Sequence, residues 1–271
     1  MPTCKLCLSE ATLRNSHIHP EFLYRDLYND QHQLMGINGE GHRGYAVLQK
    51  GLRDSLLGDC CESFLNREYE NPFLRDWIDA GVPETFRDEG VVYSVKVPDY
   101  ARFKLFHLSI LLRASWSGLG TYADVSLGPK HEERIRRMLL GGDPGKAWLY
   151  PIFGYGVADL RGKEPWPILS RPMVTELGGL RTYASIYAGV AWNIGVASHL
   201  SREFSTLGLQ PDGTLHVIAT DFRDTVEAKL AADNLRAAEA GRPVAAELHG
   251  RASRMEYRGV NGIRGIVRGH R

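Results

Sequence analysis

The chain has 271 residues, which is enough to bury a large hydrophobic core in one domain or two. Its hydrophobic content of 43%, charged content of 24% and net charge of +1 are those of a globular protein. They exclude a global electrostatic field for nucleic acid or membranes, so any basic surface must be local. No apolar run reaches the length of about 18 residues that a transmembrane helix requires. The opening "MPTCKLCLSE" lacks the basic and apolar regions of a secretory signal, so we expect a cytoplasmic protein with reduced cysteines.

We expect residues 1–80 to form an N-terminal module, because this segment holds all the cysteines of the chain: Cys4, Cys7, Cys60 and Cys61. Cysteines that serve only as small core residues would be scattered along the sequence, so the clustering favours a structural zinc site over unrelated thiols. The interval between the two pairs is too long for a simple zinc ribbon. It suits a treble-clef arrangement, in which the cysteines bracket an inserted hairpin.

Between the cysteine pairs, "LRNSHIHPEFLY" at 13–24 predicts an extended segment that becomes helical after Pro20. The glycine-rich segment 33–46 predicts a loop. Residues 45–79 predict a short strand and then an amphipathic helix interrupted near Gly58. The apolar stripe of that helix is formed by Leu52, Leu56, Leu57, Phe64, Leu65 and Tyr69.

Residues 91–241 predict a second, larger α+β domain with an antiparallel sheet. Strand patterns occur at 91–97, 147–158, 166–174, 180–198 and 214–222. A long apolar helix is predicted at 100–116. Two further helices are predicted at 128–142, which has proline near its start and glycines at its end, and at 223–241.

The segment 242–271 is rich in arginine and glycine. It predicts either an arm that neutralises phosphates or a flexible, solvated terminus. Basic residues of both the first module and this tail are candidates for nucleic-acid contact: Arg43, Lys50, Arg53, Arg251, Arg254 and Arg258.

The sequence Ser16-His17-Ile18-His19-Pro20, followed by "LLGDCCESFLNRE" at 56–68, resembles the core of an HNH (His-Me finger) endonuclease. The longer pattern, which continues through "SLGPKHEERIRRMLL" to about residue 145, also resembles uncharacterised bacterial and phage-associated HNH-like proteins. The resemblance implies a treble-clef zinc module with a ββα-metal unit, and a nuclease of phage defence or counter-defence. Two positions depart from the pattern, because Gly58 stands where a cysteine is common and Ser16 where an acid is common.

By this resemblance His17 is the general base, and a neutral imidazole suits that role at pH 7. Glu62 corresponds to the helix residue that ligates the catalytic Mg²⁺ or Mn²⁺. Asn66 follows four residues later on the same helix face. His19 is a candidate second ligand, since an extended segment would place it on the same face as His17.

Each of these assignments has a structural alternative. His17 can instead pack against or ligate the zinc, His19 can be a polar residue at a strand edge, and Glu62 can simply be an acid near a helix N-terminus. Cys60 and Cys61 are neighbours in a predicted helix and point about 100° apart, which makes tetrahedral chelation of one ion by both difficult. The zinc can therefore be held by Cys4, Cys7, Cys61 and a histidine, or by a distorted arrangement that includes Cys60. The third alternative is that the site is lost.

The function that the sequence predicts is metal-dependent hydrolysis of nucleic-acid phosphodiester bonds, with DNA favoured over RNA. Structural Zn²⁺ and catalytic Mg²⁺ or Mn²⁺ are the expected cofactors. A homo-oligomer or a partner protein is also expected, and no membrane. The alternative is a catalytically inactive, zinc-stabilised scaffold that binds nucleic acid or protein, which the departures at Ser16 and Gly58 favour.

Overall fold

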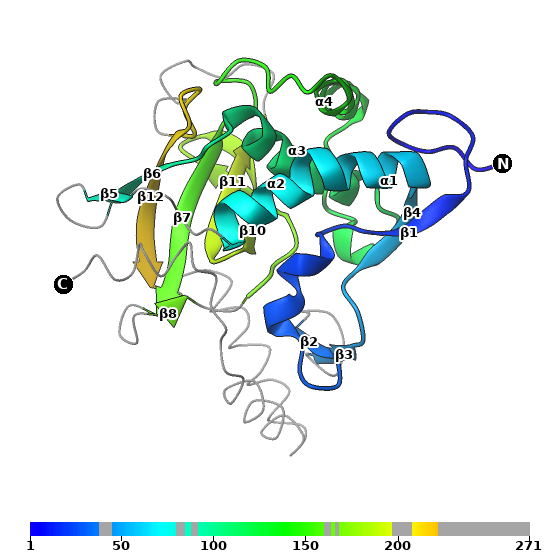
Figure 1. Cartoon of the computed structure of the whole chain (residues 1–271), viewed down its shortest axis with the longest axis horizontal. Coiled ribbons are helices and arrows are strands. Elements are labelled where there is room, and N and C mark those ends of the chain that lie inside the picture. The colour runs from blue at the N-terminus through cyan, green and yellow to red at the C-terminus, as the bar shows by residue number, and fades with distance from the viewer. Residues whose placement is uncertain are drawn as a thin grey trace.

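The structure, a computed structural model, describes residues 1–37, 45–79, 85–87, 92–159, 164–165, 168–196 and 208–221. Several sequence predictions therefore lie outside the described residues: Arg43, the helix at 223–241, and the tail with Arg251, Arg254 and Arg258. The architecture is α+β, as the sequence predicts, with a large sheet on one side and a smaller strand pair on the other (Figure 1).

The N-terminal part is built on two antiparallel strands, β1 (Leu13–His17) and β4 (Arg53–Gly58). The chain between them makes two short 3₁₀ turns, Glu21–Leu23 and Arg25–Leu27. The same connection also carries the antiparallel pair β2 (Leu34–Ile37) and β3 (Tyr45–Leu48).

The helix predicted from Leu52 onward begins later than its apolar stripe indicates, since α1 (Asp59–Leu65) starts directly after β4. Leu56 and Leu57 belong to the end of β4, where both are buried. Two successive buried residues are compatible with a strand that is covered on both faces, and this spacing also fits a helix.

A continuous helical stretch, residues 59–79, follows β4 and forms the long ribbon in the centre of Figure 1. After α1 it passes through a π-helical turn (Asn66–Glu70), α2 (Asn71–Phe73) and a second π-helical turn (Leu74–Asp79). Pro72 has no N–H to donate to the preceding turn, and a widened turn accommodates a proline inside a helix.

The second region contains a sheet whose described strands lie in the order β5-β6-β12-β7-β11-β10-β9, with β8 pairing at the free end of β7. Its pairs are antiparallel as predicted, except that β12 and β7 are parallel. The strand bounds are β5 (Thr85–Arg87), β6 (Val92–Lys96), β7 (Ile152–Asp159), β8 (Glu164–Pro165), β9 (Met173–Leu177), β10 (Leu180–Tyr187), β11 (Val190–Gly195) and β12 (Thr214–Asp221).

The predicted apolar helix is α3 (Tyr100–Trp116), which begins after Asp99, whose side chain accepts a hydrogen bond from the Arg102 N–H (2.9 Å). It is buried from residue 103 to 114 because it lies between the helical stretch and the sheet. On one side Phe106 stacks on Phe73, with ring centroids 3.8 Å apart. On the other side, the ring centroid of His107 lies 4.3 Å from that of Trp192 in β11.

The helix α4 (Pro129–Gly141) packs against α3 and ends at Gly142, whose φ of 64° suits glycine. Buried residues from segments 1–80 and 91–241 belong to one hydrophobic cluster that runs from Cys4 through α3 to Val217. The N-terminal strands and helix are therefore held against the second region by a shared core. None of the helices in the described ranges combines the length and hydropathy needed to cross a bilayer.

Candidate functional site

Three of the cysteines meet at one point. The sulfur atoms of Cys4, Cys7 and Cys61 lie within 4.8 Å of one another. Thiolates around a tetrahedral Zn²⁺, with Zn–S bonds of about 2.3 Å, are separated by about 3.8 Å, so a small inward movement would let this group hold a metal ion. No fourth His, Cys, Asp or Glu joins the group within the part of the chain that the structure describes.

The loop carrying Cys4 and Cys7 is shaped by its backbone. Leu8 has a φ of 64°, and this left-handed residue turns the chain back so that the Cys4 N–H donates to the Ser9 carbonyl (2.9 Å). A hydrogen bond from the Ser9 backbone to Cys7 lowers the pKa of that thiol to about 7. Backbone donors that stabilise a thiolate also favour metal binding, because the thiolate is the form that ligates.

Cys60, predicted as a metal ligand, does not join this group. It is exposed, whereas its neighbour Cys61 is buried, because successive helical residues point in different directions. Gly58 is explained by close packing, since a Cβ at this position would lie 2.8 Å from the Ala11 Cβ. A side chain there would push away the loop that carries Cys4.

A second group of polar residues lines a pocket of about 360 Å³ between the end of β1 and the helical stretch. The predicted residues His17, Glu62 and Asn66 all line it. Four further charged residues share its wall: Glu21, Arg25, Glu70 and Arg113. Residues far apart in the sequence thus meet because β4 returns beside β1 and leads directly into α1.

The carboxylates on the helix are held in place by neighbours. Glu62 Oε2 accepts a hydrogen bond from Ser16 Oγ (2.7 Å), which fixes the orientation of the carboxylate. Glu70 is paired with Arg113 at 2.9 Å, and Asn66 Nδ2 donates to its other oxygen at 3.4 Å. Burial raises the pKa of Glu70, while the Arg113 guanidinium opposes this shift.

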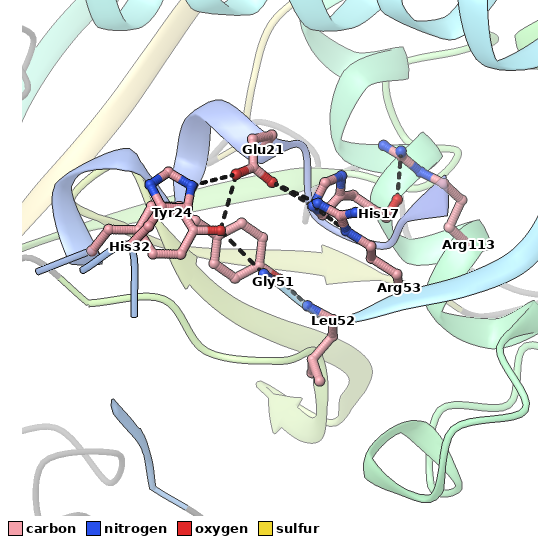
Figure 2. Close-up of polar contacts among 9 residues, drawn as sticks. His17, Glu21, Tyr24, His32, Gly51, Leu52, Arg53 and Arg113 are labelled. Atoms are coloured by element: carbon pink, nitrogen blue, oxygen red, sulfur yellow. Dashed lines mark hydrogen bonds and ion pairs between the residues drawn. The ribbon is translucent and has the colours of Figure 1, made fainter. Parts of the chain in front are cut away.

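His17 lines the pocket among charged groups. Its Nε2 accepts a hydrogen bond from Arg53 Nε (2.8 Å) and also lies against the Glu21 carboxylate (Figure 2). Burial and the Arg53 guanidinium lower the pKa of His17 to about 4, although Glu21 acts in the opposite direction. The His17 carbonyl accepts from Arg113 (2.9 Å). The imidazole is therefore neutral at pH 7, as a general base must be.

His19, predicted as a second ligand beside His17, is not among the residues that line the pocket. The strand β1 ends at His17, so the alternation of side chains no longer applies, and His19 is completely buried against the sheet. Its Nε2 lies 3.3 Å from Ser185 Oγ, whose own hydrogen goes to the Ser170 carbonyl (2.6 Å). The ring must then donate from Nε2, which leaves Nδ1 as an acceptor without a partner among the described residues.

The burial of His19 and His107 predicts acid sensitivity. Burial lowers the pKa of His19 to about 3 and that of His107 well below its ordinary value of 6.5. A depressed pKa in the folded state means that the unfolded chain binds more protons below about pH 6.5. We expect the free energy of unfolding to fall as pH drops from 7 to 5, each histidine adding a slope that approaches about 1.4 kcal/mol per pH unit.

Urea unfolding at a series of pH values measures this slope. The variant His107→Phe keeps a ring among its aromatic neighbours and is expected to flatten the dependence. The control is His32→Asn, which removes a histidine whose side chain is 63% exposed. Equal slopes for wild type and His107→Phe would contradict the prediction.

Sequence reasoning missed Glu21 and Arg113 as residues of this pocket. Arg113 had a signal, because an arginine inside an apolar helix is expected to be buried with a carboxylate partner. Glu21 had no such signal in the sequence, because its contact with His17 depends on the 3₁₀ turn that follows Pro20. Of the predicted nucleic-acid contacts that are described, Lys50 is exposed and Arg53 contacts His17.

Comparison with family models, curated proteins and solved structures gives no match for this chain.

Proposed function

We propose that the protein is a metal-dependent HNH-like endonuclease that hydrolyses phosphodiester bonds of nucleic acid, with DNA as its substrate rather than RNA. One observation carries the proposal: His17, Glu62 and Asn66, chosen from the sequence, line one pocket at the junction of β1, β4 and α1. An antiparallel strand pair that leads into a helix is the arrangement expected of the ββα-metal unit. The cysteine group beside it supports a treble-clef zinc site.

The pocket residues have distinct roles in this proposal. His17 is neutral and accepts the proton of the attacking water. Glu62 and Asn66 offer the oxygen ligands that Mg²⁺ or Mn²⁺ prefers, and Ser16 holds the Glu62 carboxylate toward the pocket. Such an ion supplies charge stabilisation for the phosphate and the leaving oxygen. Arg25 adds a positive charge to the pocket wall where a phosphate would enter.

The inactive scaffold is the second candidate, and a specific observation favours it. The pocket carboxylates already have partners in the protein, because Glu62 accepts a hydrogen bond from Ser16, Glu70 is ion-paired with Arg113, and Glu21 lies in ion-pair contact with His17 and Arg53. A scaffold would retain these contacts for stability alone. The two candidates differ in whether the chain breaks a phosphodiester bond.

Nicking of supercoiled plasmid DNA in Mg²⁺, Mn²⁺ or EDTA distinguishes them. We expect cleavage with either ion and none in EDTA. For His17→Ala we expect the cleavage rate to fall by at least about 10²-fold, because a general base contributes on the order of 10²–10⁴-fold. The matched control is His131→Ala on α4, whose histidine contacts Tyr150 outside the pocket and whose loss should leave the rate unchanged. A structured RNA is tested in parallel. Absence of cleavage of either nucleic acid by zinc-loaded wild type would leave the scaffold as the better account.

A further inference from the structure

The residues around His17 Nε2 cannot all be satisfied at once. His17 and Arg53 are directly opposite each other in the β1–β4 pair, which brings their side chains together. Arg53 Nε donates to His17 Nε2 at 2.8 Å. Glu21 Oε2 lies against the same nitrogen and is buried without a hydrogen bond from the described residues, although Arg53 Nη2 lies 3.5 Å away as an ion-pair partner.

A ring nitrogen of a neutral histidine carries either a lone pair or a hydrogen. With a lone pair on Nε2, the Arg53 Nε–H is hydrogen-bonded, whereas the Glu21 oxygen faces that lone pair and keeps only its ion pair with Arg53 Nη2. With a hydrogen on Nε2, Glu21 is satisfied and the Arg53 N–H faces another N–H. The two neighbours therefore stabilise different tautomers of His17, and only one of them can be hydrogen-bonded to Nε2 at a time.

Glu21 is held ready for the second arrangement. Its other oxygen, Oε1, accepts a hydrogen bond from Tyr28 OH (3.0 Å) and lies 3.6 Å from His32 Nε2. Tyr28 OH in turn accepts from the Gly51 N–H (3.1 Å). These contacts fix the carboxylate beside His17 whichever tautomer the ring adopts.

We propose that a substrate phosphate exchanges the hydrogen-bond partner of His17 Nε2 from Arg53 to Glu21. The exchange converts a histidine whose Nε2 lone pair is occupied by Arg53 into a general base that Glu21 orients. This inference rests on the proposed function, since the phosphate is that of the nucleic acid to be cleaved. Glu21 is then a positioning residue that acts through His17. Arg53 holds the ring in its resting tautomer until substrate arrives.

The chemistry of the groups supports phosphate as the trigger. A guanidinium binds phosphate through two parallel N–H donors, which is a better arrangement than a single bond to an imidazole nitrogen. The Arg53 side chain is 24% exposed and stands beside the pocket that His17 and Arg25 line. When Arg53 turns to a phosphate, Nε2 takes the hydrogen, Nδ1 becomes the basic nitrogen, and the Glu21 carboxylate stabilises the imidazolium that forms on proton transfer.

The test is the tautomer of His17, read from the ¹⁵N resonances of its ring at pH 7 with inorganic phosphate as the probe. In wild type without phosphate we expect Nε2 to be an acceptor and Nδ1 to carry the hydrogen. Saturating phosphate should move the hydrogen to Nε2. The variant Arg53→Met should show the Nε2–H tautomer without phosphate, and Arg53→Lys, which retains a cationic donor, should restore the resting one. In Glu21→Met the ring should keep its Nδ1–H tautomer at every phosphate concentration.

Several results would overturn the inference. One is bound phosphate that leaves the wild-type tautomer unchanged, another is absence of phosphate binding, and a third is an Arg53→Met ring identical to wild type. The wild-type titration needs no variant, so it remains decisive if a substitution perturbs folding. The measurement needs no cleavage either. A protein that exchanges tautomers but cuts no nucleic acid contradicts the proposed function alone, whereas one that cuts with an unchanged tautomer contradicts this inference alone.

Discussion

Replacing Cys61 with alanine is expected to abolish zinc binding and to lower the melting temperature sharply, whereas Cys60→Ala leaves both unchanged. The two residues are adjacent in α1, but Cys61 is buried in the group with Cys4 and Cys7, and Cys60 is exposed outside it. Substitution of neighbouring cysteines thus separates the loss of a ligand from the loss of a thiol.

The size of the effect follows from what the group connects. The Cys4–Cys7 loop is tied to β4 by a backbone hydrogen bond from the Lys5 N–H to the Leu56 carbonyl (3.0 Å), and Cys61 adds a link to α1. Structural zinc sites in small peptides contribute apparent binding free energies of about 10–16 kcal/mol. Even a fraction of this is a large share of the total stability of a domain, which is about 5–15 kcal/mol.

Metal content by mass spectrometry of the intact protein, purified under reducing conditions, gives the first readout. Thermal unfolding with and without a chelator gives the second. We expect one zinc per chain and a chelator-sensitive transition for wild type and Cys60→Ala. Wild-type protein without metal, or zinc retained by Cys61→Ala, would contradict a zinc site at these cysteines.

The local patterns of the chain were predictable because they are set by short-range chemistry. The helix predicted at 100–116 matches α3, and the helix predicted at 128–142 contains α4, since both have recognisable ends and apolar positions. Alternation and turn residues located β6, β7, β10, β11 and β12, whereas β5 and β8 were not predicted and β9 only overlaps the segment predicted at 166–174. Leu56 and Leu57 were misassigned because a pair of buried neighbours fits either kind of element.

The candidate site was predictable only in part. His17 and Glu62 carry a motif signal, but their meeting in one pocket depends on β4 returning beside β1 across the long connection. The position of His19 could not be predicted, because the end of the strand after His17 could not be located from the sequence. The role of Arg113 requires knowledge of which helix lies beneath the pocket, and tertiary packing decides that.

Arg113 is the residue whose replacement should most affect the pocket itself. It is almost fully buried, pairs with Glu70 at 2.9 Å, and donates to the carbonyl of His17 at 2.9 Å. Removal of one partner from a buried ion pair leaves an uncompensated charge, which destabilises by about 3–5 kcal/mol. We therefore expect Arg113→Met to lower the free energy of unfolding by that amount, as measured by urea denaturation at pH 7.

Two further variants identify the cause. Arg102→Met lies on the same helix, but its exposed side chain pairs with Glu68 at the surface, so we expect a change within about 0.5 kcal/mol. The double variant Arg113→Met with Glu70→Gln removes the unpaired carboxylate and should recover part of the lost stability. Arg113→Lys retains the charge but lacks the planar fork that serves Glu70 and His17 together, so its stability should fall between those of wild type and Arg113→Met.

The same contacts connect stability with chemistry. Since Arg113 comes from α3 and holds both the backbone of His17 and the carboxylate of Glu70, the pocket of the N-terminal segment is completed by the second region. Loss of Arg113 should therefore reduce cleavage by the protein that remains folded, beyond the reduction caused by unfolding. An Arg113→Met protein as stable and as active as Arg102→Met would show that the buried pair neither supports the fold nor orients the site.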